Sequence, residues 1–171
     1  MNPDPLHRWL EVVHLKAVDR AGWIQVGVGR PESVAAHSWG VAWLVLELLP
    51  SDLDLGRALA YAVLHDLPEA RVGDLTPHDG VDRCAKHALE AAAARDLLPP
   101  ALHARWEAYE AQADPEARFV RELDRLDMAL QAVVYAEEAV DVRPFFASAR
   151  EVVRSPPLVR ILETLEARAA Q

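Results

Sequence analysis

The stretch AYAVLHDLPEARVGDLTP, residues 60–77, places His65 and Asp66 side by side at the end of an apolar run. A loop-like tail that carries Glu69 and Asp74 follows. Asp66 falls at the C-terminal end of the predicted helix, where the helix dipole disfavours a carboxylate. An N-cap or a surface ion pair fits this position poorly, so the pattern indicates a cation close to Asp66.

Pro68 explains how two neighbouring side chains could share that cation. Adjacent residues of a regular helix point about 100° apart, so His65 and Asp66 would diverge. Pro68 cannot donate a hydrogen bond to residue 64, and it disturbs the turn that precedes it. A helix that ends irregularly here can direct both side chains toward one ion.

Nearly all of the remaining chain repeats with helical spacing. The run WIQVGVG, residues 23–29, is short and broken by glycine, so we expect a loop there. The sequence predicts an all-α fold, a single compact domain over residues 1–171 with a bundle of about six to seven helices. Ser33 is the expected N-cap of the second helix. The expected helices cover about 5–18, 33–49, 54–65, 82–98, 101–112, 115–140 and 156–169.

The composition limits the possible partners of the protein. A net charge of −9 disfavours nucleic acid, although a bound divalent ion could still create a site for a small phosphorylated ligand. No apolar run approaches the roughly 18 residues of a membrane span, and the N-terminus does not resemble a secretory signal. The single Cys84 has no thiol partner, which agrees with a reducing compartment. We therefore expect a cytoplasmic protein that binds neither nucleic acid nor membrane.

His37 is the next candidate ligand. It lies on the apolar face of its predicted helix, between Val34 and Val41, so its ring should point into the core. A lone buried histidine is usually a neutral group bonded to a backbone carbonyl. The His65–Asp66 pair makes a ligand role the better interpretation here.

A further ligand should come from RELDRLDMALQA, residues 121–132, which offers Asp124 and Asp127. Both flank an apolar seam, and spacing alone does not choose between them. Aspartates beside arginines can also be solvated ion pairs of little energy. Two imidazoles and two carboxylates suit one divalent ion such as Mn, Co, Zn, Fe or Mg, which could polarise a phosphoryl oxygen and activate water.

Three segments in this order resemble a known family: GWIQVGVGRPESVAAHSWGVA (22–42), HDLPEARVGDLTP (65–77) and ELDRLDMALQA (122–132). Together they resemble the HD-domain metal-dependent phosphohydrolase superfamily, in its 5′-deoxynucleotidase branch, the YfbR and HD-domain-containing protein 2-like proteins. The resemblance covers about residues 10–140. It implies an HD-domain fold and hydrolysis of deoxynucleoside 5′-monophosphates to deoxynucleoside and phosphate. The implied metal ligands are His37, His65, Asp66 and Asp124.

The resemblance also implies roles around the metal. Glu69 would orient or deprotonate the attacking water, or protonate the leaving sugar oxygen. Asp74 would contact the deoxyribose, and Trp23 would pack against the sugar or base and help to exclude a 2′-hydroxyl. The wall beside the sugar would consist of Leu75, Thr76 and Pro77.

The sequence departs from the family pattern at two positions. Some relatives carry a phosphate-binding arginine directly before the tryptophan, where this chain has Gly22; Arg20 and Arg30 are the candidates to replace it. Ala36 stands where relatives often carry an acid before the metal histidine, which would remove a hydrogen bond to the ligand.

Several alternatives stay open at this point. The substrate could be another nucleotide, such as a cyclic nucleotide, a nucleoside triphosphate or an alarmone. A catalytically silent nucleotide-sensing module is a further possibility, although Glu69 and Asp74 argue against it. The family is typically dimeric, so we expect a homodimer, with Trp39 and Trp43 against a neighbouring helix or a second subunit.

Overall fold

The computed structural model describes residues 5–76, 79–138 and 140–171. These residues form α-helices, one 3₁₀ helix and a single isolated β-bridge, and no strand occurs among them, which confirms the all-helical prediction. None of the helices in these ranges is long and apolar enough to cross a membrane. The elements are α1 (Pro5–Val13), η1 (His14–Ala17, 3₁₀), α2 (Ala21–Gln25), α3 (Val34–Leu48), α4 (Leu55–Leu64), α5 (Glu69–Val72), α6 (Arg83–Leu97), α7 (Pro100–Glu110), α8 (Pro115–Ala136), α9 (Arg143–Val152) and α10 (Pro156–Ala169).

Each of the predicted segments contains a helix, although α8 ends at Ala136 and not near residue 140, and the sequence did not predict α2, α5 or α9. The expected loop at 23–29 is wrong in its first part, because α2 extends to Gln25. Helices of five and four residues, such as α2 and α5, are too short to show a periodic apolar pattern. The first predicted helix ends earlier than expected, at Val13, and continues as the 3₁₀ turn η1.

Short polar side chains determine where the long helices begin. Ser33 caps α3, as predicted, by accepting a hydrogen bond from the backbone N–H of Ala36. Aspartates act in the same way at α4, α6 and α8, where each accepts from the N–H three residues later. These aspartates are Asp54, Asp82 and Asp114.

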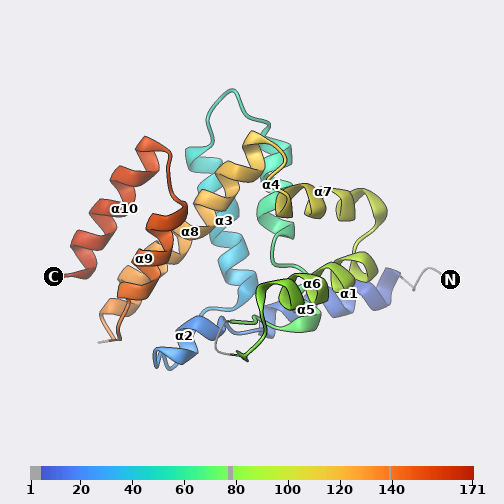
Figure 1. The fold of residues 1–171 in the computed structure, drawn as a ribbon, viewed down its shortest axis with the longest axis horizontal. Coiled ribbons are helices and arrows are strands. Elements are labelled where there is room, and N and C mark those ends of the chain that lie inside the picture. Colours follow the sequence, from blue (N-terminus) through green and yellow to red (C-terminus); the bar gives the residue numbers. More distant parts are fainter. Residues whose placement is uncertain (1–4, 77–78, 139) are drawn as a thin grey trace.

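The long helix α8 organises the bundle. Helices α3 and α4 pack against each other and against α8, while α9 and α10 cover α8 on the side toward the C-terminus (Figure 1). Helices α1, α5, α6 and α7 lie on the opposite side of α4 (Figure 1). The core between α3, α4 and α8 is aliphatic, with Val41, Val45, Leu123 and Leu126 fully buried. This arrangement brings the ends of α3 and α4 and the middle of α8 together around a set of polar side chains.

Candidate active site and metal centre

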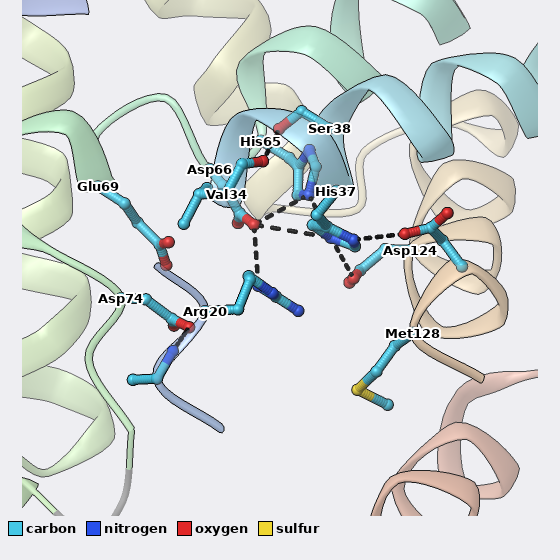
Figure 2. Close-up of polar contacts among 12 residues, drawn as sticks. Arg20, Val34, His37, Ser38, His65, Asp66, Glu69, Asp74, Asp124 and Met128 are labelled. Atoms are coloured by element: carbon cyan, nitrogen blue, oxygen red, sulfur yellow. Dashed lines mark hydrogen bonds and ion pairs between the residues drawn. The ribbon is translucent and has the colours of Figure 1, made fainter. Parts of the chain in front are cut away.

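Four side chains from three segments converge beside the α3–α4–α8 core (Figure 2). His37 on α3 and His65 at the end of α4 direct their Nε2 atoms toward each other, 3.3 Å apart. Asp124 of α8 places Oδ1 3.2 Å from Nε2 of His37. Asp66 places Oδ2 3.2 Å from Nε2 of His65 and 3.8 Å from Nε2 of His37. We refer to His37, His65, Asp66 and Asp124 as the ligand cage.

The turn after α4 forms as Pro68 predicts. The helix ends at Leu64, and residues 65–68 form turns rather than a further helical repeat. The ring of His65 is fixed because its Nδ1 lies 2.9 Å from the carbonyl oxygen of Ala62, so Nδ1 donates and Nε2 faces the cage. The indole N–H of Trp106 donates to the backbone carbonyl of His65 and holds the turn from the other side.

Three members of the cage, His37, His65 and Asp124, have the spacing that a divalent ion requires, and Asp66 lies beside them. Two ligand atoms about 2.1 Å from one ion and at right angles lie about 3.0 Å apart, close to the 3.2 and 3.3 Å separations around His37 Nε2. The ligand atoms of His37, His65 and Asp124 all lie within 4.8 Å of one another. Nitrogen and carboxylate oxygen together suit Mn, Fe, Co or Zn, and the residues present therefore fit a divalent metal.

The charges in the cage are strongly coupled. Burial would raise the pKa of Asp66, but the neighbouring His65, Arg20 and His37 hold it well below its usual range. Burial opposes ionisation of Asp124 too, yet Arg125 and His37 lower its pKa. Both carboxylates are thus kept ionised.

His37 carries the opposite charge in this state. Burial and the charge of Arg20 would lower the pKa of His37, but hydrogen bonds to Asp124 and Asp127 outweigh them and raise it to about 9. The cage therefore holds a proton at neutral pH in the position where a metal ion would bind.

A cavity of about 260 Å³ opens from the cage. Arg20 projects into it and places Nη1 3.4 Å from Oδ2 of Asp66 (Figure 2). Burial alone would lower the pKa of Arg20, but Asp66, Asp74 and other carboxylates raise it, so the guanidinium stays charged. Arg30, the other candidate for phosphate binding, is exposed and is not among the residues that line this cavity.

Glu69 lines the same cavity from the N-terminus of α5. Its side chain is buried, its Oε1 lies 3.5 Å from Nζ of Lys86, and its Oε2 has no hydrogen-bond partner. Burial raises the pKa of Glu69 well above its ordinary value, and the charges of Asp66 and Asp74 add to that effect. Glu69 is thus a buried carboxyl group with a raised pKa and one oxygen without a hydrogen-bond partner.

The loop after α5 brings predicted sugar-binding residues to this cavity. Leu75 and Thr76 line it, whereas Pro77 lies outside the residues that the structure describes. Asp74 also lines it, but one of its oxygens is occupied because Oδ2 accepts a hydrogen bond from the backbone N–H of Ala21 at 2.8 Å. This bond joins the loop after α5 to the start of α2.

Trp23 is held rigidly at the cavity. It is 1% exposed, its indole N–H donates to Glu32, and its ring stacks on Phe145 of α9 with centroids 3.8 Å apart. Phe145 itself lines the cavity, as do three other residues that the sequence analysis missed: Lys86, Arg125 and Met128. The sequence did carry one sign of Lys86: nearly all basic residues of the chain are arginine, and Lys86 is one of two lysines, with Lys16.

The cage also opens in a second direction. A cavity of about 350 Å³ is lined by His65, Asp66 and Asp124 together with residues of α6, α7 and α8. Access from two sides leaves room for water and for a substrate oxygen beside four protein ligands. Lys86 and Arg125 line both cavities and add positive charge on either side.

Comparison with known proteins agrees with this geometry. A family model described as HD domain matches residues 12–161. The bovine protein named 5′-deoxynucleotidase HDDC2 is 36% identical over 168 residues, which covers 91% of this chain and 81% of the bovine protein. The human protein of the same name is 35% identical with the same coverage. This chain therefore belongs to the HD domain family and falls in the branch of these 5′-deoxynucleotidases, which confirms the resemblance seen in the sequence.

Solved structures share the fold. A conserved hypothetical protein from Pyrococcus furiosus superposes with a TM-score of 0.82 at 31% identity, covering 95% of this chain and 99% of the other. A structure from Magnetospirillum magnetotacticum, described as a predicted metal-dependent phosphohydrolase, gives a TM-score of 0.72 at 26% identity, covering 99% of this chain and 96% of the other.

The raised pKa of His37 predicts that metal binding expels a proton. Because the folded pKa is about 9, Nε2 is protonated at neutral pH and must lose its proton to bind an ion. Below that pKa we expect the affinity of the metal-free protein for Mn²⁺ to rise about tenfold per pH unit. Calorimetry in two buffers of different ionisation enthalpy measures the released proton. The control variant His14→Gln, which changes an exposed histidine, should release the same proton on binding Mn²⁺. Mn²⁺ binding that is independent of pH would contradict the protonation of His37.

Proposed function

We propose that this protein is a metal-dependent 5′-deoxynucleotidase that hydrolyses deoxynucleoside 5′-monophosphates to deoxynucleoside and phosphate. The observation that carries the proposal is the placement of the ligand cage, Arg20 and Glu69 around one cavity. The curated relatives named 5′-deoxynucleotidase, which match this chain over most of its length, support the same substrate class.

The ligand cage would hold one divalent ion, with His37 and His65 as nitrogen ligands and Asp66 and Asp124 as oxygen ligands. Such an ion supplies polarisation of a phosphoryl oxygen and lowers the pKa of water. Mn, Co, Zn, Fe and Mg are the candidates, and the mixed nitrogen and oxygen set favours the first four over Mg.

Arg20 is the group that would bind the phosphate. Its guanidinium is charged and mostly buried beside the cage, where it can donate two parallel hydrogen bonds to phosphate oxygens. Its ion pair with Asp66 is long, at 3.4 Å, so the arginine can turn toward a substrate without losing a strong bond.

Glu69 would act as the proton donor to the leaving group. As water attacks phosphorus and the P–O5′ bond breaks, the sugar oxygen needs a proton to leave as an alcohol. A carboxyl group whose pKa is raised by burial is suited to give it, while the proton of the attacking water goes to the phosphate product or to solvent. Of the roles that the resemblance allows for Glu69, the structure favours this one.

The sugar would lie between Trp23 and the loop that follows α5. Because Trp23 is buried, bonded to Glu32 and stacked on Phe145, it is an immobile wall that leaves little space for a 2′-hydroxyl. Asp74 would contact the 3′-hydroxyl side of the deoxyribose with its second oxygen, and Leu75, Thr76 and Pro77 would complete the pocket.

We also propose that the protein is a cytoplasmic homodimer. An apolar face defined by Val13, Trp39, Trp43, Leu46 and Val63 is exposed on α1, α3 and α4. Trp39 is 71% exposed and Trp43 50% exposed, one turn apart on α3. Val13, Trp39 and Val63 line a largely apolar groove of about 350 Å³. A largely apolar face with two exposed tryptophans suits pairing with itself about a two-fold axis.

Phosphate release from a nucleotide panel tests the activity. We expect turnover of 5′-dNMPs when Mn²⁺ or Co²⁺ is added to the metal-stripped protein, and little turnover of ribonucleotides, 3′-monophosphates or dNTPs. Glu69→Gln should lower kcat by about 10²–10⁴-fold, because the variant has no proton to donate. Wild-type activity should fall as pH rises through the raised pKa of Glu69. Turnover confined to cyclic nucleotides or triphosphates, or metal binding without any turnover, would refute the proposal.

A matched pair of variants tests whether Arg20 or Arg30 binds the phosphate. Arg20→Met should lower kcat/KM for a 5′-dNMP by about 10²-fold or more, because a charged donor to the phosphate is lost. Arg30→Met removes an exposed arginine outside the cavity and should leave kcat/KM unchanged. A larger loss in the Arg30 variant would reverse the assignment.

Size-exclusion chromatography with light scattering measures the mass of the protein in solution and so tests whether it is a homodimer. The wild type should have twice the 18.9 kDa mass of one chain. Trp39→Glu should shift it toward the monomer, because a charge on the apolar face cannot be buried at the interface. Leu89→Glu changes an apolar residue on α6 that is 47% exposed and should leave the mass unchanged. A monomeric wild type would contradict the proposal.

A further inference from the structure

Asp127 binds the side of the His37 ring that faces away from the ligand cage. Its Oδ2 lies 2.8 Å from Nδ1 of His37, while the Nε2 atom of the same ring faces Asp124 and His65. Asp124 and Asp127 are three residues apart on α8, so neighbouring positions of one helix contact both nitrogens of the ring. Asp127 does not line either cavity beside the cage.

The pairing determines which ring nitrogen can bind a metal. An ionised carboxylate only accepts hydrogen bonds, so Nδ1 must carry the hydrogen and the lone pair of Nε2 is left for an ion. Glu32 is the other carboxylate close to this end of the ring, but it already accepts the indole N–H of Trp23 at 3.1 Å. Ala36, which precedes His37, is exposed and has no polar side chain.

Gly40 provides the space that Asp127 occupies. A Cβ atom added at Gly40 would lie 2.1 Å from Oδ1 and 2.8 Å from Cγ of Asp127. Real Cβ atoms do not approach other atoms so closely, so any side chain at this position would displace the carboxylate. Gly40 lies inside α3, one turn after His37, where a glycine weakens a helix relative to alanine. The close contact with Asp127 explains why a glycine stands inside α3 at this position.

We propose that Asp127 is a positioning residue that holds His37 with Nδ1 protonated and Nε2 directed into the ligand cage, and that Gly40 is required because it leaves room for that carboxylate. This inference rests on the proposed role of His37 as a metal ligand. It adds a residue and a packing constraint outside the cage and outside the substrate cavity.

Metal affinity of the stripped protein is the first test. Asp127→Asn keeps the size of the side chain but replaces the charged carboxylate that faces Nδ1 with a neutral amide. We expect the Kd for Mn²⁺ to increase about 10–100-fold. Gly40→Ala should produce a loss of similar size, and the double variant should bind no more weakly than the weaker single variant, because both changes remove the same contact. Gly29→Ala adds a methyl group where no atom lies within 4 Å and should bind like the wild type.

A measurement without metal or substrate separates this inference from the proposed activity. In protein with ¹⁵N-labelled histidine, the buried Nδ1–H of His37 should give a downfield proton resonance that exchanges slowly with water. We expect it to be absent from His37→Gln and to move upfield in Asp127→Asn. An unchanged resonance together with an unchanged Kd in Asp127→Asn would overturn the positioning role. If the wild type binds Mn²⁺ but hydrolyses no nucleotide, the activity proposal fails, and the loss of affinity in Asp127→Asn still supports the positioning role.

Discussion

Two buried imidazole nitrogens that face each other across 3.3 Å beside the helical core are the constraint on which the site depends. Two lone pairs at that distance repel, so something positive must lie between or beside them. In the metal-free protein a proton on His37 meets that need, with Asp66 and Asp124 as its counterions. A divalent ion would satisfy all four groups at once, which explains why such a polar cluster is retained beside an aliphatic core.

The rest of the structure holds this cluster in place. Pro68 ends α4 so that His65 and Asp66 project in the same direction, and a carbonyl from the preceding turn fixes the ring of His65. Helix α8 passes the cage with Asp124 on one side of His37 and Asp127 on the other. The cavity beside the cage is lined in part by shorter segments, α2 and the loop after α5, which are joined by the bond from Ala21 to Asp74. Helices α3 and α8 and the turn after α4 thus carry the cage, and the adjoining cavity combines short segments with residues of α6, α8 and α9.

The sequence predicted the helical fold and three of the four cage residues, His37, His65 and Asp66, because these depend on local patterns. The position of Asp66 against the helix dipole and the position of His37 on an apolar face are visible in a short window. The choice between Asp124 and Asp127 needed the family resemblance, because both flank the same seam of α8. Lys86, Met128 and Phe145 could not be found this way, since periodicity shows which face of a helix is buried but not which distant helix meets it. The hydrogen bond of Asp127 and the contact with Gly40 depend on the crossing of α3 and α8, which no spacing rule provides.

Anomalous diffraction from crystals soaked with Mn²⁺, recorded at the manganese absorption edge, would show whether the ligand cage binds the metal. We expect one anomalous peak inside the cage, about 2.0–2.3 Å from Nε2 of both histidines and from an oxygen of Asp66 and of Asp124. Nδ1 of His37 should still face Asp127 in that structure. A peak elsewhere, or none at a concentration that supports phosphate release, would show that these four residues do not form the metal centre.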